Sequence, residues 1–138
     1  MNKIIVYGDG GCESNGTKDA RAYGSFIVQT HLGGATIYQH TSGRLDFGDP
    51  ATNNVAEIKT FIAAIEYVLS RDDSSVISYP VLYYTDSQLV VNWLNGNWKC
   101  KQSHLVPLVE EARRLMRRFM SLSVEWVSRE TIEKILGH

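Results

Sequence analysis

The 138-residue chain is 43% apolar, which is enough to bury one sizeable core and leaves little material for a second, so we expect a single domain over residues 1–138. The formal net charge of −1 excludes attraction of polyanions through overall charge, and any affinity for nucleic acid must come from a local arrangement. Two cysteines, no secretory leader pattern and no apolar run of bilayer-spanning length predict a reduced, cytoplasmic protein without a membrane partner, and we expect a monomer.

The first 41 residues contain three predicted strands. The apolar run at residues 4–6 predicts a buried strand that stops at a glycine turn, which places Asp9 at a strand end. Residues 22–30 and 35–41 are rich in β-branched and aromatic side chains and are separated by two glycines, so they predict a hairpin and an antiparallel three-strand meander. Two stretches rich in small polar residues are expected to be loops, namely 10–20 and 42–54.

Helices and strands alternate in the rest of the chain. An apolar stripe from Val55 to Leu69, preceded by three N-cap candidates, predicts the clearest helix. Asp86 stands at the junction between a predicted strand and a short helix. The remaining elements are a strand at 79–85, helices at 87–95 and 105–119, a strand at 122–127 and a helix at 132–136. The order βββαβααβα predicts an α/β fold with a five-stranded mixed sheet flanked by helices.

Three acidic residues are expected to meet in this fold. Asp9 and Asp86 end strands that we expect to pair in parallel, and Glu57, in the first turn of the long helix, leans over the same edge. Three clustered carboxylates repel one another unless a cation lies among them. Oxygen ligands suit Mg²⁺ or Mn²⁺, and two such ions activate water and stabilise the leaving oxygen in phosphodiester hydrolysis.

Each acid also has a local explanation. An aspartate beside two glycines, such as Asp9, serves turns; a glutamate in a first helical turn, such as Glu57, favours the helix dipole; and an aspartate before a helix, such as Asp86, caps it. Only their joint spacing and order favour a shared site.

Four stretches in sequence order strengthen that interpretation: YGDGGCESNG (7–16), TNNVAEIKTFIAAIEYV (52–68), YYTDSQLVVNWLNG (83–96) and VEWVSRE (124–130). Together they resemble the type 1 ribonuclease H family across nearly the whole chain. The resemblance implies the ribonuclease H-like fold and hydrolysis of the RNA strand of RNA–DNA hybrids by two metal ions, leaving 5′-phosphate and 3′-hydroxyl ends. It also implies that Asp9, Glu57 and Asp86 are the first three of four catalytic metal ligands.

The resemblance further implies a set of substrate contacts. Minor-groove contacts fall to Cys12, Asn15, Asn53, Asn54 and Gln88. The side-chain amides of the three asparagines and of Gln88 suit recognition of 2′-hydroxyls, because an amide is both donor and acceptor. Thr52 matches a position that holds a DNA-strand phosphate. From its own surroundings, Trp98, which lies beside two lysines, is expected either to stack on the DNA strand or to pack in the core.

The chain departs from the family pattern at its fourth acid. No aspartate follows Trp126. The pair Gly137-His138 resembles forms of the family in which histidine replaces the aspartate, so His138 is expected as the fourth catalytic metal ligand, with Glu133 as the alternative. A histidine ligand suits Mn²⁺ better than Mg²⁺. His138 is equally explained as a frayed terminus. Gly8 stands where the family usually has threonine or serine. Two other functions therefore remain open: a weak or inactive hybrid-binding module, and a different nuclease or nucleotidyl transferase, which the four amides disfavour.

Overall fold

A mixed β-sheet forms the centre of the molecule. The computed structural model describes residues 2–48, 52–71 and 78–137. Strands β1 (Lys3–Glu13), β2 (Arg21–Leu32) and β3 (Ala35–Thr41) form the predicted antiparallel meander. Strand β5 (Val81–Thr85) pairs in parallel with β1, and β6 (Leu122–Trp126) pairs in parallel with β5, which gives the order β3-β2-β1-β5-β6.

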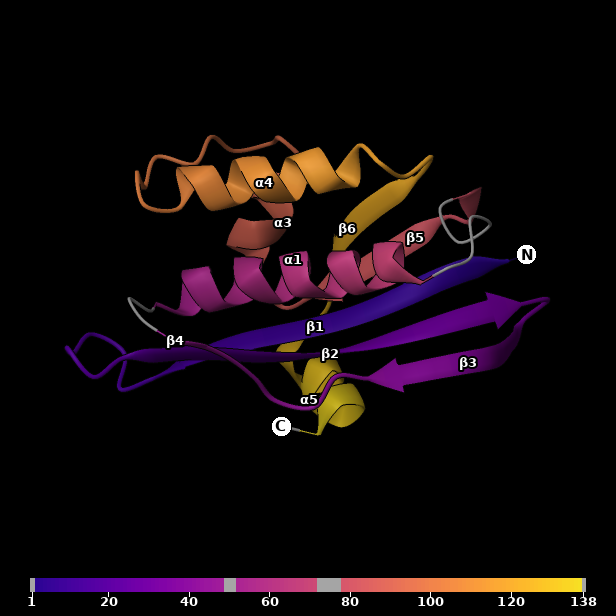
Figure 1. Ribbon diagram of the computed structural model, residues 1–138, viewed down its shortest axis with the longest axis horizontal. Helices are drawn as coiled ribbons and strands as arrows, with labels where there is room; N and C mark the ends of the chain where they lie inside the picture. The colour runs from indigo at the N-terminus through magenta and orange to yellow at the C-terminus, as the bar shows by residue number, and fades with distance from the viewer. Residues whose placement is uncertain (1, 49–51, 72–77, 138) are drawn as a thin grey trace.

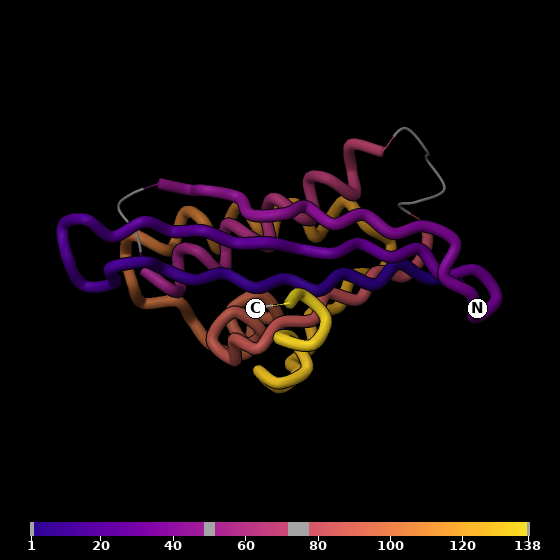
Figure 2. The backbone as a smooth tube through the Cα atoms, turned by 90° about the horizontal axis from the view of Figure 1, so that it is seen from below, coloured from indigo at the N-terminus to yellow at the C-terminus, as the bar shows by residue number. Residues whose placement is uncertain are grey.

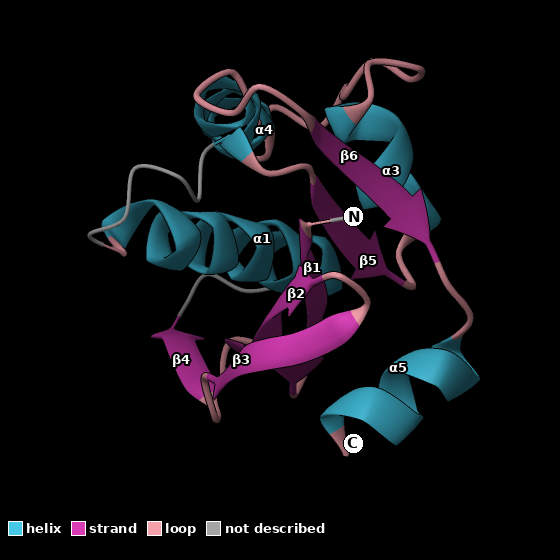
Figure 3. Ribbon diagram, turned by 90° about the vertical axis from the view of Figure 1, so that its right-hand side faces the viewer, coloured by secondary structure: helices cyan, strands magenta, loops and turns pink. Residues whose placement is uncertain are grey.

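Helices cover both faces of this sheet (Figures 1 and 3). Helix α1 (Asn53–Ser70) packs on β1 and β2, and α4 (Val106–Met116) lies over α1. Helix α3 (Gln88–Leu94) packs among β6, α1 and α4, whereas α5 (Arg129–Leu136) lies on the opposite face against β1 and β2. Within the described ranges, no helix combines the length and the apolar character needed to span a bilayer.

The core lies between α1 and the sheet. The buried stripe of α1 includes Ile58, Phe61 and Ile65, none of which is measurably exposed. The Phe61 ring meets the edge of the buried Tyr83 ring from β5, with centroids 4.7 Å apart. Burying each of these large side chains contributes roughly 1.5–3 kcal/mol. This contact fixes α1 over β1 and β5.

The expectation that the first strand stops at a glycine turn was wrong. Strand β1 continues through Asp9 to Glu13, and no glycine between Gly8 and Gly11 has a positive φ. A Cβ on Gly10 would lie 2.5 Å from the backbone carbonyl carbon of Ala56 in α1. The glycine is therefore explained by the close approach of a helix backbone to the strand, and not by a turn.

The two stretches expected to be loops were also partly wrong. Residues 45–48 form β4 (Leu45–Gly48), a short strand that pairs with β2, so the sheet has six strands instead of five. Residues 10–13 belong to β1, and helix α5 begins at Arg129, before the predicted start. The N-cap expectation is confirmed, because the Thr52 side chain accepts a hydrogen bond from Val55 N at 3.2 Å.

Candidate metal centre

Three carboxylates from three elements meet at the end of the parallel strands. One oxygen each of Asp9, Glu57 and Asp86 lies within 4.8 Å of the others. The last parallel pair of β1 and β5 is Tyr7 with Tyr84, so both strands deliver an aspartate two residues further on. The predicted convergence is thus present, although Asp9 lies inside β1 and Asp86 just after β5.

Glu57 is buried and is held by hydrogen bonds at both of its carboxylate oxygens. It lies in the second turn of α1, not in the first as expected, and only 8% of it is exposed. Its carboxylate accepts hydrogen bonds from the backbone N–H of Gly10 and from Thr85 Oγ1, the latter at 3.1 Å. Burial, and then the negative charge of Asp9, raise the pKa of Glu57 to about 8, against the lowering effect of the two hydrogen bonds. A cation bound among the carboxylates would favour the ionised form of Glu57, and so would oppose the effects of burial and of the Asp9 charge on its pKa.

A buried phenol lies under the cluster. Tyr83 is 1% exposed, and its burial, followed by the charges of Glu57, Asp9 and Asp86, raises its pKa well above the ordinary value. A Cβ on Gly8 would lie 1.8 Å from the Tyr83 hydroxyl oxygen. Gly8 therefore departs from the family's threonine or serine because the phenol occupies the space such a side chain needs.

Arg129, at the first position of α5, joins the cluster from the other face of the sheet. Its Nη1 lies 2.9 Å from both carboxylate oxygens of Asp9 and 3.0 Å from Asp86 Oδ2. Helix α5 lies across the middle part of β1 (Figure 2). Hydrogen bonding to Asp86, and then to Asp9, raises the pKa of Arg129 above its ordinary value.

Sequence reasoning missed Arg129, yet a signal was present. A cation in the first turn of a helix is unfavourable for the helix dipole, so an arginine there indicates a specific anionic partner. The separation of 120 positions between Arg129 and Asp9 hid that partner.

The two residues considered for the fourth metal ligand, Glu133 and His138, have different outcomes. The Glu133 carboxylate, which is half exposed, does not belong to the described three-acid cluster and instead accepts a hydrogen bond from Arg129 Nε at 3.2 Å. His138 lies outside the described residues. The position of a fourth ligand in this chain is therefore still a prediction.

Most of the expected substrate-contact residues lie on or next to the elements that carry the three acids. Cys12 is the last but one residue of β1, and the exposed Asn15 follows in the β1–β2 turn. This turn lies at the same end of the molecule as the start of α1 (Figure 1). The predicted amides of α1 and α3 fall in the first turns of those helices, at Asn53, Asn54 and Gln88. Trp98 is 47% exposed, which excludes the core-packing alternative.

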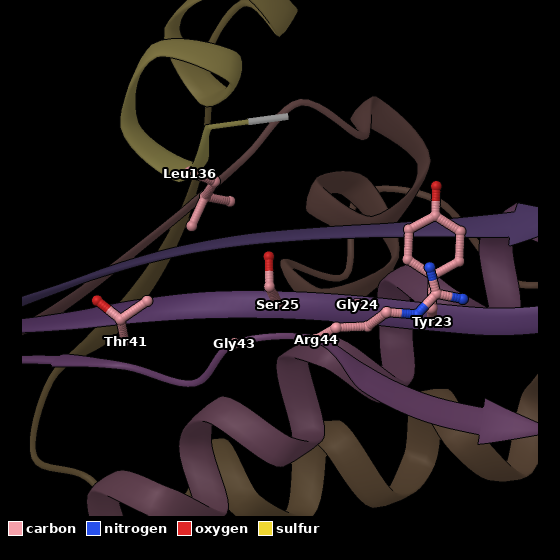
Figure 4. A pocket seen from close by; sticks show the side chains of 7 residues that line it. All are labelled: Tyr23, Gly24, Ser25, Thr41, Gly43, Arg44 and Leu136. Atoms are coloured by element: carbon pink, nitrogen blue, oxygen red, sulfur yellow. The ribbon is translucent and has the colours of Figure 1, made fainter.

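A pocket of about 360 Å³ adjoins this region on the α5 face (Figure 4). Ser25 points into it from β2 and Leu136 from α5, while Arg44 lies over the Tyr23 ring at 4.4 Å. Ser25 is the cross-strand partner of Asp9, so both side chains lie on the same face of the sheet. The pocket is thus continuous with the face on which Asp9 stands.

The sheet order and the carboxylate cluster at the end of its parallel strands define the ribonuclease H-like class. A family model described as reverse transcriptase-like matches residues 17–134. The crystal structure of RNase H1 from the halophilic archaeon Halobacterium salinarum superposes with a TM-score of 0.77 at 27% identity, covering 95% of this chain and 89% of that one. LC11-RNase H1, solved in complex with RNA/DNA hybrid, superposes with a TM-score of 0.74 at 25% identity, covering 96% of this chain and 90% of that one.

Sequence comparison finds a relative over nearly the whole chain. The bifunctional protein Rv2228c of Mycobacterium tuberculosis is 31% identical over 130 residues, which cover 92% of this chain and 32% of that protein. This chain therefore spans about a third of that relative's length. The chain belongs to the reverse transcriptase-like family of ribonuclease H domains.

Proposed function

We propose that this chain is a ribonuclease H that hydrolyses the RNA strand of RNA–DNA hybrids with two divalent metal ions and leaves 5′-phosphate and 3′-hydroxyl ends. The observation that carries the proposal is the meeting of Asp9, Glu57 and Asp86 within 4.8 Å. The likeness to an RNase H1 solved with RNA/DNA hybrid supports this choice of substrate. The whole chain from 1 to 138 acts as one catalytic domain in this proposal.

The donor set fits hard divalent cations. All three side chains offer carboxylate oxygens, and the described cluster contains neither a thiolate nor an imidazole, which favours Mg²⁺ or Mn²⁺. Bound there, such ions supply Lewis-acid activation of water and stabilisation of the leaving oxygen. His138, if it completes the set, would favour Mn²⁺.

The protein contributes rigid placement of these oxygens. Glu57 is held at both oxygens by Gly10 N–H and Thr85 Oγ1, and Thr85 Oγ1 also accepts a hydrogen bond from the backbone N–H of Ser87 at 3.1 Å. The Trp126 indole Nε1 donates to the Asp86 carbonyl oxygen at 3.2 Å, which fixes the turn that presents Asp86. Ligands held in this way lose little freedom when a cation binds.

The proposed substrate contacts follow the same edge. Amides discriminate RNA by pairing with 2′-hydroxyls as donor and acceptor, and we assign this role to Asn15, Asn53, Asn54 and Gln88, with Cys12 beside them. Thr52 binds a DNA-strand phosphate in addition to capping α1. Trp98, exposed beside Lys99, stacks on the DNA strand. A monomer in a reducing, cytoplasmic setting accords with the free thiols of Cys12 and Cys100.

A hybrid-binding module without catalysis is the second candidate. Its support is that no fourth acid joins Asp9, Glu57 and Asp86 among the described residues. Retention of a buried, mutually repelling cluster argues against it, since three carboxylates kept together without a cation cost stability.

One cleavage experiment separates these functions. End-labelled hybrid, RNA duplex and DNA duplex are each incubated with the protein in Mg²⁺, in Mn²⁺ and in chelator. We expect cleavage of RNA in the hybrid alone, dependent on metal and lost in Asp9→Asn and Asp86→Asn. Asp46→Asn, which changes an exposed aspartate paired with Arg44, is the matched control and should retain activity. Hybrid binding without cleavage would favour the binding module, and cleavage of duplex DNA would refute the assignment.

A further inference from the structure

A single nitrogen atom of Arg129 lies between the carboxylates of Asp9 and Asp86. Nη1 contacts Oδ1 and Oδ2 of Asp9 and Oδ2 of Asp86, all at 2.9–3.0 Å. One positively charged donor surrounded by three carboxylate oxygens is the arrangement that a bound cation also adopts. The two aspartates come from different strands, so the guanidinium links β1 to the end of β5 from outside the sheet.

The oxygens that hold Arg129 are those a divalent ion needs. A hard cation bound to Asp9 and Asp86 has carboxylate oxygens as its first ligands at about 2.0–2.2 Å, which places it within a few ångströms of Nη1. A guanidinium and a doubly charged ion at that separation repel strongly, because the Asp9 side chain is only 5% exposed and solvent screens the pair poorly. The two cations therefore exclude each other from this position.

The Arg129 side chain has room to move away from the aspartates. Its side chain is 53% exposed, so the guanidinium can turn outwards without a change in the backbone. Glu133, one helical turn further along α5, accepts its Nε at 3.2 Å and is itself 54% exposed. The start of α5 stays fixed during such a movement, because Ser128 Oγ accepts the backbone N–H of Thr131 at 3.2 Å.

We propose that Arg129 is a positioning residue whose guanidinium competes with divalent metal for Asp9 and Asp86, so that metal entry requires Nη1 to leave the aspartates for solvent while the existing contact of Nε with Glu133 can persist. The inference rests on the proposed metal-dependent function of this site. Arg129 holds the two aspartates at their working separation until an ion takes over, and it lowers the apparent metal affinity in doing so.

Metal binding measured without substrate tests the competition. Calorimetric titration of the full chain with Mn²⁺, and separately with Mg²⁺, is compared for the wild type, Arg129→Ala and Arg129→Gln. Because Arg129 is half exposed, its loss should tighten the first binding step by about three- to tenfold. Arg129→Lys keeps the charge but has one point donor in place of the planar fork, so its affinity should fall between wild type and Arg129→Ala.

Lys134→Ala supplies the matched control. It removes one positive charge from the same helix, where Lys134 pairs only with the exposed Glu130 in the described interactions. Its metal affinity should stay within about twofold of wild type, as expected for an exposed pair. An affinity of Arg129→Ala equal to or weaker than that of wild type overturns the competition. Absence of metal binding in the wild type and all variants refutes the metal centre, and with it the proposed function.

A direct observation needs no substitution. The Nε–Hε signal of Arg129 in a ¹⁵N-edited NMR spectrum should shift as Mg²⁺ is added, with the same midpoint as the calorimetric titration. Arg44, whose guanidinium pairs with Glu13 and Asp46 away from the cluster, is the internal reference and should not shift. Saturation with Mg²⁺ that leaves the Arg129 signal unchanged would show that the guanidinium stays in place, and the inference would fail.

Discussion

Replacing Glu57 by glutamine should stabilise the protein in chelator and remove much of its pH dependence. Glutamine keeps the shape of the side chain, and its oxygen can accept the Gly10 N–H while its amide donates to Thr85 Oγ1. What it removes is the ionisable carboxyl whose pKa is raised from 4.5 to about 8 by burial and by the charge of Asp9. The change therefore isolates the electrostatic cost of the cluster.

The sign and size of this effect follow from the pKa of Glu57. Because the folded-state pKa is raised, the folded protein binds more protons than the unfolded chain between pH 4.5 and about 8. The contribution of Glu57 to the free energy of unfolding is fully present below pH 4.5. It falls by about 1.4 kcal/mol per pH unit above that pH, until the pH passes the folded-state pKa. At pH 7 the cost is on the order of 3 kcal/mol, which Glu57→Gln should recover.

Urea unfolding at pH 5, 6, 7 and 8 in chelator measures this difference. The free energy of unfolding of Glu57→Gln should exceed that of wild type by an amount that grows with pH, from about 1 kcal/mol or less at pH 5 to about 3 kcal/mol at pH 7. Glu66→Gln, which changes an exposed glutamate on the same helix, is the control and should follow the wild type. Curves for wild type and Glu57→Gln that run parallel over this range would refute the reasoning.

Three further predictions come from the same site. Gly8→Ala should destabilise the fold by about 1–3 kcal/mol, and by less in a Tyr83→Val background, because its Cβ would lie 1.8 Å from the phenol oxygen; a double-mutant cycle by urea unfolding measures the coupling. Gly10→Ala should weaken metal binding roughly tenfold or more in calorimetry, because its Cβ meets the backbone of α1 at 2.5 Å and displaces Glu57. Metal binding at pH 7 should release protons, because Glu57, with a pKa of about 8, must ionise to bind; calorimetry in buffers of different ionisation enthalpy detects the release, and a buffer-independent heat would contradict it.

The sequence predicted elements whose signals are local. The α1 stripe and the cap at Thr52 depend on neighbouring residues, and the structure places that helix within two residues of the predicted range at either end. The convergence of the acids could also be predicted, because parallel strands end at a shared edge. Strand β4 could not, since a four-residue strand between glycines and a proline carries too short an alternating pattern to distinguish it from a loop.

The interpretation of the glycines in β1 failed for a different reason. Gly8 and Gly10 were interpreted through their own backbone freedom, but each is required by a neighbour distant in sequence, the Tyr83 phenol for one and the α1 backbone for the other. A glycine needed for close packing has the same local signature as a glycine needed for a turn. Only knowledge of the partner distinguishes the two.

The position of Arg129, the raised pKa of Glu57 and the neutral phenol of Tyr83 all reflect one buried, negatively charged site. Burial, and then the charges of the neighbouring carboxylates, raise the pKa of Glu57 and of Tyr83. Glu57 retains a proton, Tyr83 does not lose one, and Arg129 supplies a positive charge from outside the sheet. A divalent ion bound here would neutralise the negative charge that Glu57, Tyr83 and Arg129 now share. The metal affinity of the site therefore depends on the cost of removing the Glu57 proton and the Arg129 guanidinium, as well as on the ligands that bind the ion.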